Sequence, residues 1–405
     1  MKILSEKITE QIEYLTQIHT AWDGTEQRVV LRGKPRRYVK YEYVGVNTKQ
    51  SQYLRALTCS TQTQVLQFPL WHANTILENM IYDRQSIVAL KKQDMWNYRD
   101  CAGTMLWTND EEGGEYFTLK NVSADGILHL GKQVTHNWKA FSTFVVPVFW
   151  GILQQEDKYT NLTAELTNMT INVEFINRGL SIDLPDGVNE YNYPRLSFAE
   201  SKNALDEYLG RELFMMPPTW NEDIGSSYSR NANRLDNQSG VIRYDLKSNE
   251  TTEVRSMEYS AISYEELQFI QRFFCRCKGR LKSFYAPTWV IDVELVESVT
   301  SGNVLIAKFN LYWKYYMSSK RRKTLIVFFQ DGTIEILKIA GFSLDDSQKY
   351  GKIFLDMPIK KALHKSEIKM ISFLCLYRFN SDTLTTDYET TGIANINLEF
   401  AEVTE

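Results

Sequence analysis

A chain of 405 residues is longer than the roughly 250 to 300 residues at which a single hydrophobic core stops growing, so two or three domains are expected. The composition, 43% hydrophobic and 24% charged, is typical of a globular protein and excludes fibrous and disordered classes. A net charge of −4 gives no general attraction to nucleic acid or to an anionic membrane. Aromatic residues make up 13% of the chain and supply large apolar surfaces to bury.

The N-terminus and the cysteines predict a cytosolic product without a membrane segment. Lys2 and Glu6 flank the first apolar residues, and no apolar stretch of signal-peptide length follows. The most apolar window, residues 141–153, contains Pro147 and is shorter than the roughly 20 residues needed to cross a bilayer. The cysteines number 5 and are scattered, which fits reduced thiols better than a disulfide framework.

The first predicted element is an amphipathic N-terminal helix, because Ile8, Ile12 and Leu15 recur at helical spacing. Residues 51–59 are expected to form a second short helix. Segments rich in β-branched and aromatic residues, several of them alternating apolar with polar, predict strands. These are residues 36–46, 171–176, 289–296, 305–313, 325–329, 333–337 and 396–400.

A further helix is defined by its ends. Ser263 and Glu266 form a capping box at its start, and Gly279 stands where a helix commonly ends in a left-handed glycine. Asp331-Gly332 supplies turn chemistry between two predicted strands. The fold class predicted is therefore mainly β with a few short helices.

An internal repeat is the most informative feature of the organisation. Similar landmarks occur in the same order in each half of the chain, and the distances from Pro-x-Trp to the closing strand differ by only a few residues. The landmarks are a tryptophan (Trp22 and Trp220), a helix, Pro-x-Trp (69–71 and 287–289), Asp-Gly (125–126 and 331–332) and the closing INVEF or INLEF strand (171–175 and 396–400). We predict two copies of one β-rich domain, residues 1–180 with the N-terminal helix and residues 215–405, joined by a connector over 181–214. The alternative interpretation is that the INVEF and INLEF segments are two ordinary strands of similar composition and that the chain contains no repeat.

No catalytic, cofactor-binding or metal-ligating residue is predicted. The histidines form no H-x-x-x-H pair, and Cys275 and Cys277 point in different directions on a helix. The glycine pair Gly113-Gly114 lies among glutamates, which repel phosphate. We therefore expect a protein that is not an enzyme and needs no cofactor. Sequence does not decide whether two carboxylates flank a cleft, so a hydrolase stays an alternative.

Two basic clusters, residues 32–37 and 320–323, have two interpretations. Each could bind phosphate or an acidic partner surface. Each also has the composition of a charged hairpin turn that guards strand edges, and this solvated turn is the preferred interpretation.

Three segments resemble a known family. Residues 24–37 contain G-x-E-Q-R before an arginine-rich strand, residues 273–280 end a helix in Gly-Arg, and residues 371–382 form an aromatic strand followed by Asn-Ser-Asp. In these motifs the chain resembles the distal tail and minor tail (tail-tip, baseplate) proteins of long-tailed bacteriophages and gene-transfer agents. The second half departs from the pattern, because a polar stretch over 221–253 replaces G-x-E-Q-R. The cysteine set of neighbouring iron–sulfur hub proteins is absent, so no cluster is expected.

The resemblance implies a structural virion protein with two tandem tail-tube-like β-sandwich or barrel domains. It would be a distal tail or baseplate hub adaptor, assembled in the host cytoplasm and located in the virion tail. Three chains would form a pseudo-sixfold ring, with a hexamer as the alternative. The ring would bind the tail tube protein on one side and hub, spike or fibre proteins on the other, with DNA only as cargo. Residues expected at the subunit interface are Glu26, Arg28, Arg32 and Arg36.

Two other functions remain open at this point. The aromatic residues could form sugar-stacking platforms of a carbohydrate-binding tail module for host attachment. A cell-wall hydrolase would need an acidic pair in a cleft.

Overall fold

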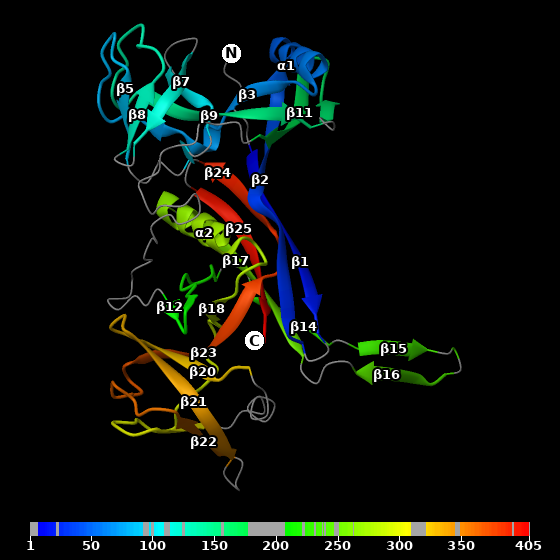
Figure 1. The fold of residues 1–405 in the computed structure, drawn as a ribbon, viewed down its shortest axis with the longest axis vertical. Coiled ribbons are helices and arrows are strands. Elements are labelled where there is room, and N and C mark those ends of the chain that lie inside the picture. The colour runs from blue at the N-terminus through cyan, green and yellow to red at the C-terminus, as the bar shows by residue number, and fades with distance from the viewer. Residues whose placement is uncertain are drawn as a thin grey trace.

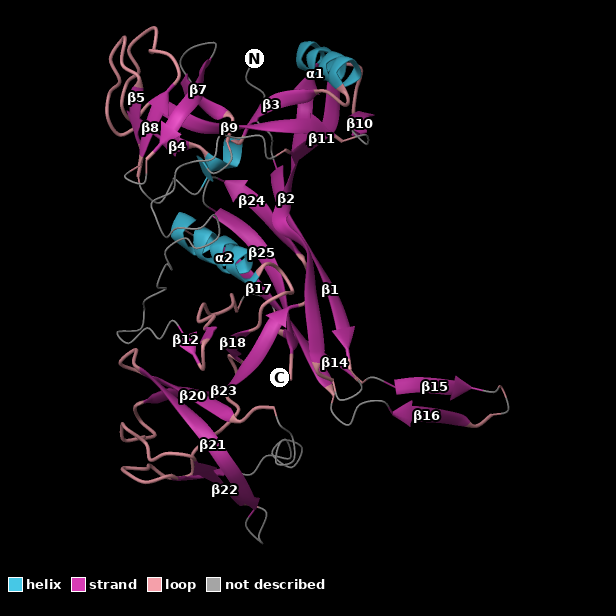
Figure 2. Ribbon diagram, in the orientation of Figure 1, coloured by secondary structure: helices cyan, strands magenta, loops and turns pink. Residues whose placement is uncertain are grey.

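The computed structural model describes residues 7–21, 24–91, 97–98, 101–108, 114–123, 126–154, 158–176, 207–220, 223–230, 232–236, 238, 240–246, 251–261, 263–308, 321–344, 349–390 and 393–404. These residues form large antiparallel sheets and two α-helices, which confirms the predicted mainly-β class (Figure 2). No helix in this part of the chain is long and apolar enough to span a membrane.

We call residues 7–176 the first half and residues 207–404 the second half. The elements of the first half are β1 (Lys7–Thr20), β2 (Glu26–Asn47), α1 (Thr48–Thr61), β3 (Val65–Pro69), the 3-10 helix η1 (Trp71–Ala73), β4 (Thr75–Ile76), β5 (Ile87–Ala89), β6 (Gly103–Thr108), β7 (Gly114–Val122), β8 (Ile127–Leu130), β9 (Thr143–Leu153), β10 (Lys158–Asn161) and β11 (Leu166–Phe175). Those of the second half are β12 (Glu207–Tyr208), β13 (Arg211–Glu212), β14 (Gly225–Ser229), β15 (Ala232–Asp236), β16 (Ile242–Leu246), β17 (Thr252–Ala261), α2 (Tyr264–Cys277), β18 (Phe284–Pro287), β19 (Val304–Lys308), β20 (Thr324–Phe329), β21 (Ile334–Leu344), β22 (Tyr350–Leu355), β23 (Ile368–Phe379), β24 (Thr383–Thr390) and β25 (Ile393–Glu402).

The two halves use one strand-pairing scheme. In the first half β2 pairs with β1 and β11, β11 with β9 and β10, β9 with β3 and β6, and the ladder continues through β7 and β8 to β5. In the second half β17 pairs with β14 and β25, β25 with β23 and β24, β23 with β18 and β20, and the ladder continues through β21 and β22 to β19. The helix α1 follows β2 as α2 follows β17.

The correspondence extends to individual residues of the closing strands β11 and β25. Each closing strand sets its isoleucine opposite a tyrosine and its phenylalanine opposite an arginine. These pairs are Ile171 with Tyr41 and Phe175 with Arg37 in the first half, and Ile396 with Tyr259 and Phe400 with Arg255 in the second. Matching cross-strand partners are stronger evidence for a repeat than the similar sequences of the two closing strands.

Only part of the predicted repeat corresponds in this topology. Pro-x-Trp follows β3 in the first half and β18 in the second, which are equivalent strands. Trp220 precedes β14 and is exposed, and its predicted counterpart Trp22 lies outside the described residues. Gly126 precedes β8 while Gly332 precedes β21, so these turns are not equivalent. The division at residues 181–214 stays a prediction, because residues 177–206 lie outside the described part of the chain.

Among the described strands, one ladder joins the halves. β1 pairs with β2 on one edge and with β24 on the other, from Ile8 opposite Tyr388 to Glu13 opposite Thr383. One sheet therefore runs through the molecule in the order β3–β9–β11–β2–β1–β24–β25–β17–β14 (Figure 1). Within the described residues the strands form no closed barrel.

The two faces of this sheet differ because successive side chains alternate in direction. One face carries the hydrophobic cores, one in each half, with Val173 of β11 and Leu398 of β25 among their members. α2 lies beside β17 and β25 and buries most of its side chains against the second core (Figure 1). The other face is polar, with Asn172 on β11, Lys40 on β2 and Gln11 on β1.

The predicted N-terminal helix is wrong, because residues 7–20 form β1. Burial along it alternates with a period of two: Glu10, Ile12 and Tyr14 are buried, and Leu15 is exposed. β1 forms hydrogen-bonded ladders with strands on both sides, and these outweigh three residues at helical spacing. A strand buried between two others is recognised by that alternation.

The other two helix predictions are confirmed. α1 contains residues 51–59. The side chain of Ser263 accepts a hydrogen bond from the Glu266 amide and the Glu266 side chain accepts one from the Ser263 amide, so the capping box caps α2. Gly279 follows the last turn at φ +63°, as a helix-ending glycine should. The turn at Asp331-Gly332 joins β20 to β21 as predicted.

The strand predicted over residues 289–296 is wrong. Trp289 has φ +57°, a left-handed conformation that interrupts an extended chain. The carboxylate of Asp292 instead accepts a hydrogen bond from the Phe373 amide of β23 at 2.8 Å. A side chain thus occupies an amide that a paired strand would bind with a backbone carbonyl. The other predicted strands lie in strands of the structure, apart from one residue each at 176 and 333, and residues 309–313 are outside the described part of the chain.

Candidate interface at the junction of the two halves

The β1–β2 hairpin carries the contacts between the halves. It leaves the first half and runs beside β24 and β25 of the second half (Figure 1). Near the hairpin tip, Thr25 forms a parallel bridge with Thr404. The ladder between β1 and β2 is irregular between Glu13 and Leu15, opposite residues 32–36.

Five polar side chains meet beneath β1 and form what we call the Glu10 cluster: Glu10, Arg37, His72, Gln271 and Tyr388. The Glu10 carboxylate accepts hydrogen bonds from Arg37 Nε, from the Tyr388 hydroxyl at 2.8 Å and from Gln271 Nε2 at 3.5 Å. His72 Nε2 lies 3.2 Å from the same carboxylate, and its ring lies 4.1 Å from that of Tyr388. The members come from β1, β2, η1, α2 and β24, so the cluster joins both halves.

The charges in the Glu10 cluster are fixed by burial and pairing. Burial alone would raise the pKa of Glu10, but Arg37, with His72 and Tyr388, holds it well below its ordinary value. Burial lowers the pKa of His72 and raises that of Tyr388. The cluster therefore contains one charged pair, Glu10 with Arg37, and two neutral rings. No member is adjusted towards pH 7 in the way that a general acid or base requires.

A second set of contacts centres on Asp382, in the turn between β23 and β24. Its carboxylate accepts hydrogen bonds from the Thr16 amide at 2.7 Å and the Arg280 amide at 2.9 Å, and it pairs with the Arg280 guanidinium at 3.1 Å. The backbone oxygen of Asp382 accepts from the Tyr14 amide at 2.8 Å. A Cβ on Gly279 would lie 2.6 Å from this carboxylate, so glycine is needed there for space as well as for its positive φ.

The predicted interface residues lie along the same hairpin. Glu26 accepts two hydrogen bonds from Arg378 of the second half, both 2.8 Å, and Arg28 donates to the Leu281 carbonyl at 3.0 Å. Arg32 binds within the hairpin, to Glu13 at 2.9 Å. These residues contact the same chain.

Arg36 is different from the other three. Its guanidinium lies 3.9 Å from Glu174 on the polar face, and its side chain is 55% exposed. A role of all four residues between subunits stays a prediction.

Neither basic cluster is a solvated turn. In the first, Lys34 and Arg36 are exposed as predicted, but they lie in a strand. In the second, Arg321 and Arg322 are buried, and Lys320 lies outside the described residues. Residues 32–37 lie within β2 at its irregular pairing with β1, and the connection between the two strands comes earlier, between Thr20 and Glu26. In the other cluster, Arg322 is fully buried and pairs with Glu253 and with Glu402 at 3.2 Å. A guanidinium buried with two carboxylates binds strands together, and in sequence it is indistinguishable from an exposed one.

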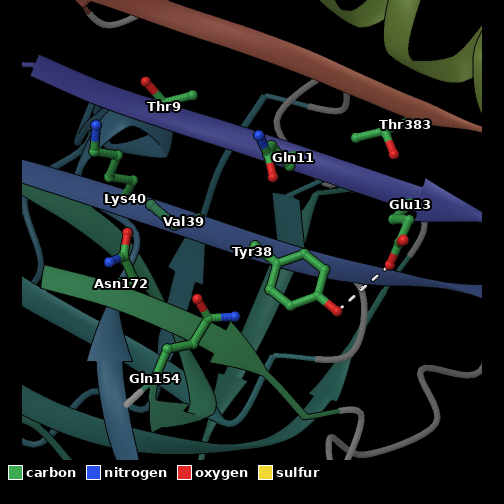
Figure 3. A pocket seen from close by; sticks show the side chains of 9 residues that line it. All are labelled: Thr9, Gln11, Glu13, Tyr38, Val39, Lys40, Gln154, Asn172 and Thr383. Atoms are coloured by element: carbon green, nitrogen blue, oxygen red, sulfur yellow. Dashed lines mark hydrogen bonds between the residues drawn. The ribbon is translucent and has the colours of Figure 1, made fainter. Parts of the chain in front are cut away.

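The polar face of the sheet is hollowed beside the junction. A cavity of about 310 Å³ lies over β1, β2 and β11, and Figure 3 shows polar side chains around it. Its lining is Thr9, Gln11, Glu13, Tyr38, Val39, Lys40, Gln154, Asn172 and Thr383. The lining holds one carboxylate, Glu13, whereas glycoside hydrolysis uses two.

The cysteines and histidines form no metal site in the described residues, where no group of three or more His, Cys, Asp or Glu side chains is placed to hold an ion. Cys275 and Cys277 are buried within α2, and burial raises the pKa of the Cys277 thiol. Both side chains pack in the second core.

Sequence reasoning missed Glu10, His72 and Asp382. A signal existed for Glu10: read as a strand, residues 8–14 place it among core-facing side chains, and a carboxylate there requires a partner. No signal identified His72 or Asp382, because their partners are far away in the sequence.

Comparison with known proteins adds no relative. No family model matches the chain, and no curated protein matches it significantly. The pairing scheme and the junction are therefore the observations from which a function is argued.

Proposed function

We propose that this chain is a structural protein of a bacteriophage-like tail, a distal tail or baseplate hub adaptor that joins the tail tube to tail-tip or fibre proteins. The observation that carries the proposal is the continuous sheet made of two copies of one pairing scheme. Tube subunits join their sheets edge to edge, and β1 with β24 forms such a junction inside a single chain.

The two faces of the sheet suit a tube wall. The core face is covered by α2 and the two hydrophobic cores. The polar face carries both signs of charge close together, such as Lys40 beside Glu42 and Arg36 near Glu174. We propose that this face lines the channel, because a mixed, nearly neutral wall would let DNA pass without binding it.

The junction also supports a stoichiometry. If each half occupies one position of a sixfold ring, three chains complete it and present threefold symmetry to partners. The aromatic content serves this architecture, since the largest fully buried side chains are all Tyr or Phe. They include Tyr259, Phe284 and Phe379.

Two measurements test the proposal. Immunogold labelling of particles that carry the chain is expected to mark the distal end of the tail, and label confined to the head or absent from particles would overturn the function. Mass photometry of the purified protein is expected to show a species of three times the chain mass of 47.2 kDa. Six or twelve chains per ring would contradict the trimer.

The same preparation separates this function from its rivals. Specific binding on a glycan array would favour a carbohydrate-binding module, and clearing of cell wall in a zymogram would favour a hydrolase. We expect neither.

A further inference from the structure

Each half of the chain contains a hairpin and a surface that could receive one, but among the described residues only one hairpin meets such a surface. The hairpin β1–β2 of the first half lies on the second half, along β24, the loop after α2 and the turn at Asp382. The pairing scheme gives the hairpin of the second half as β14–β17, extended by β15 and β16. It gives the receiving surface of the first half as β10 and the loop after α1.

The two receiving surfaces differ in exposure: the one on the second half is covered by the hairpin β1–β2, and the one on the first half is not. On the second half, β24 alternates partly buried and buried residues from Thr383 to Tyr388, and Arg280 and Leu281 after α2 are half-buried beneath the hairpin. On the first half, three of the four residues of β10 are exposed, and so are Gln62, Thr63 and Gln64 after α1. β10 pairs with β11 and with no other strand of the described chain. The first half thus has an uncovered receiving edge.

The hairpin of the second half has an exposed edge as well. Every residue of β14 is exposed, and β17 is its one partner among the described strands. Strands β15 and β16, which we call the arm, project from the body of the protein (Figure 1). An isolated two-stranded hairpin is marginally stable in water, so an arm of this kind needs a surface to pack on.

One face of the arm carries a row of exposed apolar side chains. Ile242, Tyr244 and Leu246 alternate along β16 and therefore point to one side, with exposures of 45%, 62% and 51%. On β15 the same face carries Ala232 opposite Leu246, Arg234 opposite Tyr244 and Asp236 opposite Ile242. Arg234 and Asp236 pair with each other at 2.9 Å, so the apolar row lies on β16 alone. The other face holds Leu235 opposite Arg243. An exposed apolar row of this kind marks a contact surface.

We infer that β14 and the arm of one chain pack on β10 and the loop after α1 of a second copy of this chain. The contact repeats between chains what β1–β2 makes with β24 inside one chain. It is head to tail, because each chain offers one free hairpin and one free edge, and such contacts build rings or filaments. The inference rests on the ring-forming function proposed above and names the surfaces that close the ring.

The first experiment removes the arm from the full chain. Replacing residues 231–250 with Asn-Gly leaves Arg230 and Thr251 to close β14 and β17 as a short hairpin. We expect a folded protein, with unchanged circular dichroism and thermal midpoint, that is a monomer in mass photometry while the intact chain is an oligomer. Assembly of the shortened chain, or an intact chain that stays monomeric at all concentrations, overturns the inference.

Matched substitutions test the apolar face without shortening the chain. Ile242→Asp is expected to weaken assembly at least 10-fold, and Leu235→Asp, on the opposite face and similarly exposed, is expected to change it less than 2-fold. Equal effects of the two variants would show that the face does not matter and would contradict the proposed contact.

A photo-crosslinker identifies the receiving surface. Benzoylphenylalanine in place of Tyr244 is expected to give crosslinks between chains that map to residues 62–64 or 158–161. The same group in place of Tyr82, which is 56% exposed on the first half, should not. Crosslinks to another surface in an assembling protein overturn this inference but not the proposed function. Crosslinks at these residues without label at the tail tip leave the contact and overturn the function.

Discussion

In the first half the β1–β2 hairpin pairs with β24 of the other half, whereas in the second half the equivalent hairpin ends in an arm whose strands, among the described strands, pair with each other alone. The strands that carry the two hairpins, β2 and β17, pair in the same way with the closing strands. The scaffold is therefore common to both halves, and the hairpins differ in what they meet. The same hairpin can therefore be covered or exposed, depending on whether another half lies beside it. The described chain places such a half beside the first hairpin and not beside the second.

The equivalent arginines of the two halves show a second difference. Arg37 is paired with Glu10 on the adjacent strand β1, while Arg255 is paired with Glu253 two residues earlier on its own strand. The first pair is completed by Tyr388 from the other half. The equivalent arginine is thus neutralised by its own strand in the second half and by the adjacent strand in the first, where Tyr388 and Gln271 of the other half donate to the same carboxylate. The junction therefore contributes to the stability of the first half.

The largest effect is expected from the closing phenylalanines. Phe400 is fully buried among Phe214, Phe284 and Phe379, with ring centroids 5.1 to 5.5 Å away. Among the described residues, the ring of Phe175 packs against that of Phe149, at 5.3 Å. Truncating a buried phenylalanine costs about 3–5 kcal/mol.

We therefore expect Phe400→Ala to lower the free energy of unfolding by about 4–5 kcal/mol and Phe175→Ala by about 3 kcal/mol. Urea unfolding followed by circular dichroism measures both. Equal losses would mean that the two cores stabilise their closing strands equally. The predicted difference in stability between the halves would then be wrong.

The next largest effect is expected at Glu10. Glu10→Gln leaves the Arg37 guanidinium partly buried without its carboxylate, which should cost about 2–3 kcal/mol, less than for a fully buried charge because 23% of the Arg37 side chain is exposed. Glu13→Gln is the matched control on the same strand. Its pair with Arg32 is more exposed, so the free energy of unfolding should change by less than about 1 kcal/mol. A Glu10 variant as stable as the control would contradict the role of the cluster.

A smaller effect is expected at Asp382. Asp382→Asn removes the charge that accepts from the Thr16 and Arg280 amides, at a cost of about 1–2 kcal/mol. Hydrogen exchange should quicken in residues 14–20, where the hairpin crosses the second half, and remain slow in β25. Asp356→Asn, at an exposed pair with Lys338, is the control and should leave exchange unchanged.

Sequence predicted what depends on local chemistry. The capping box at Ser263, the turn at Gly332 and the strands rich in β-branched residues all formed, because neighbouring residues determine them. The repeat was visible in the closing strands and in Pro-x-Trp, since equivalent strands conserve these positions in the two halves. The Asp-Gly turns lie outside the shared strand pairing, and their similar order in the sequence does not correspond to equivalent positions in the fold.

The rest depends on contacts between distant residues. Ile8 and Ile12 suggested a helix, and only the pairing with β2 and β24 makes that segment a strand. Arg322 and exposed arginines have the same sequence signature, and only burial with Glu253 and Glu402 distinguishes them. The junction was therefore not predictable, although its core-facing glutamate could have been noticed.

The smallest effect is expected from His72 and depends on pH. Burial lowers the pKa of His72 below its ordinary value of 6.5, and its contact with Glu10 only partly opposes this. Below about pH 6.5 the unfolded chain binds a proton that the folded chain does not, so stability falls as pH falls. Glu10, whose pKa is lowered, adds a loss in the same direction only below its ordinary pKa of 4.5.

Between pH 7.5 and 5.5 the loss due to His72 should therefore be seen alone as the difference between the intact chain and His72→Gln. Glutamine keeps a donor for Glu10 but does not titrate, so the variant should lose less stability over this range. Urea midpoints at pH 7.5, 6.5 and 5.5 measure it, and His19→Gln, at an exposed position on β1, should follow the intact chain. If the His72 variant has the same pH dependence as the intact chain, the ring is not held neutral, and the Glu10 cluster carries more charge than its geometry indicates.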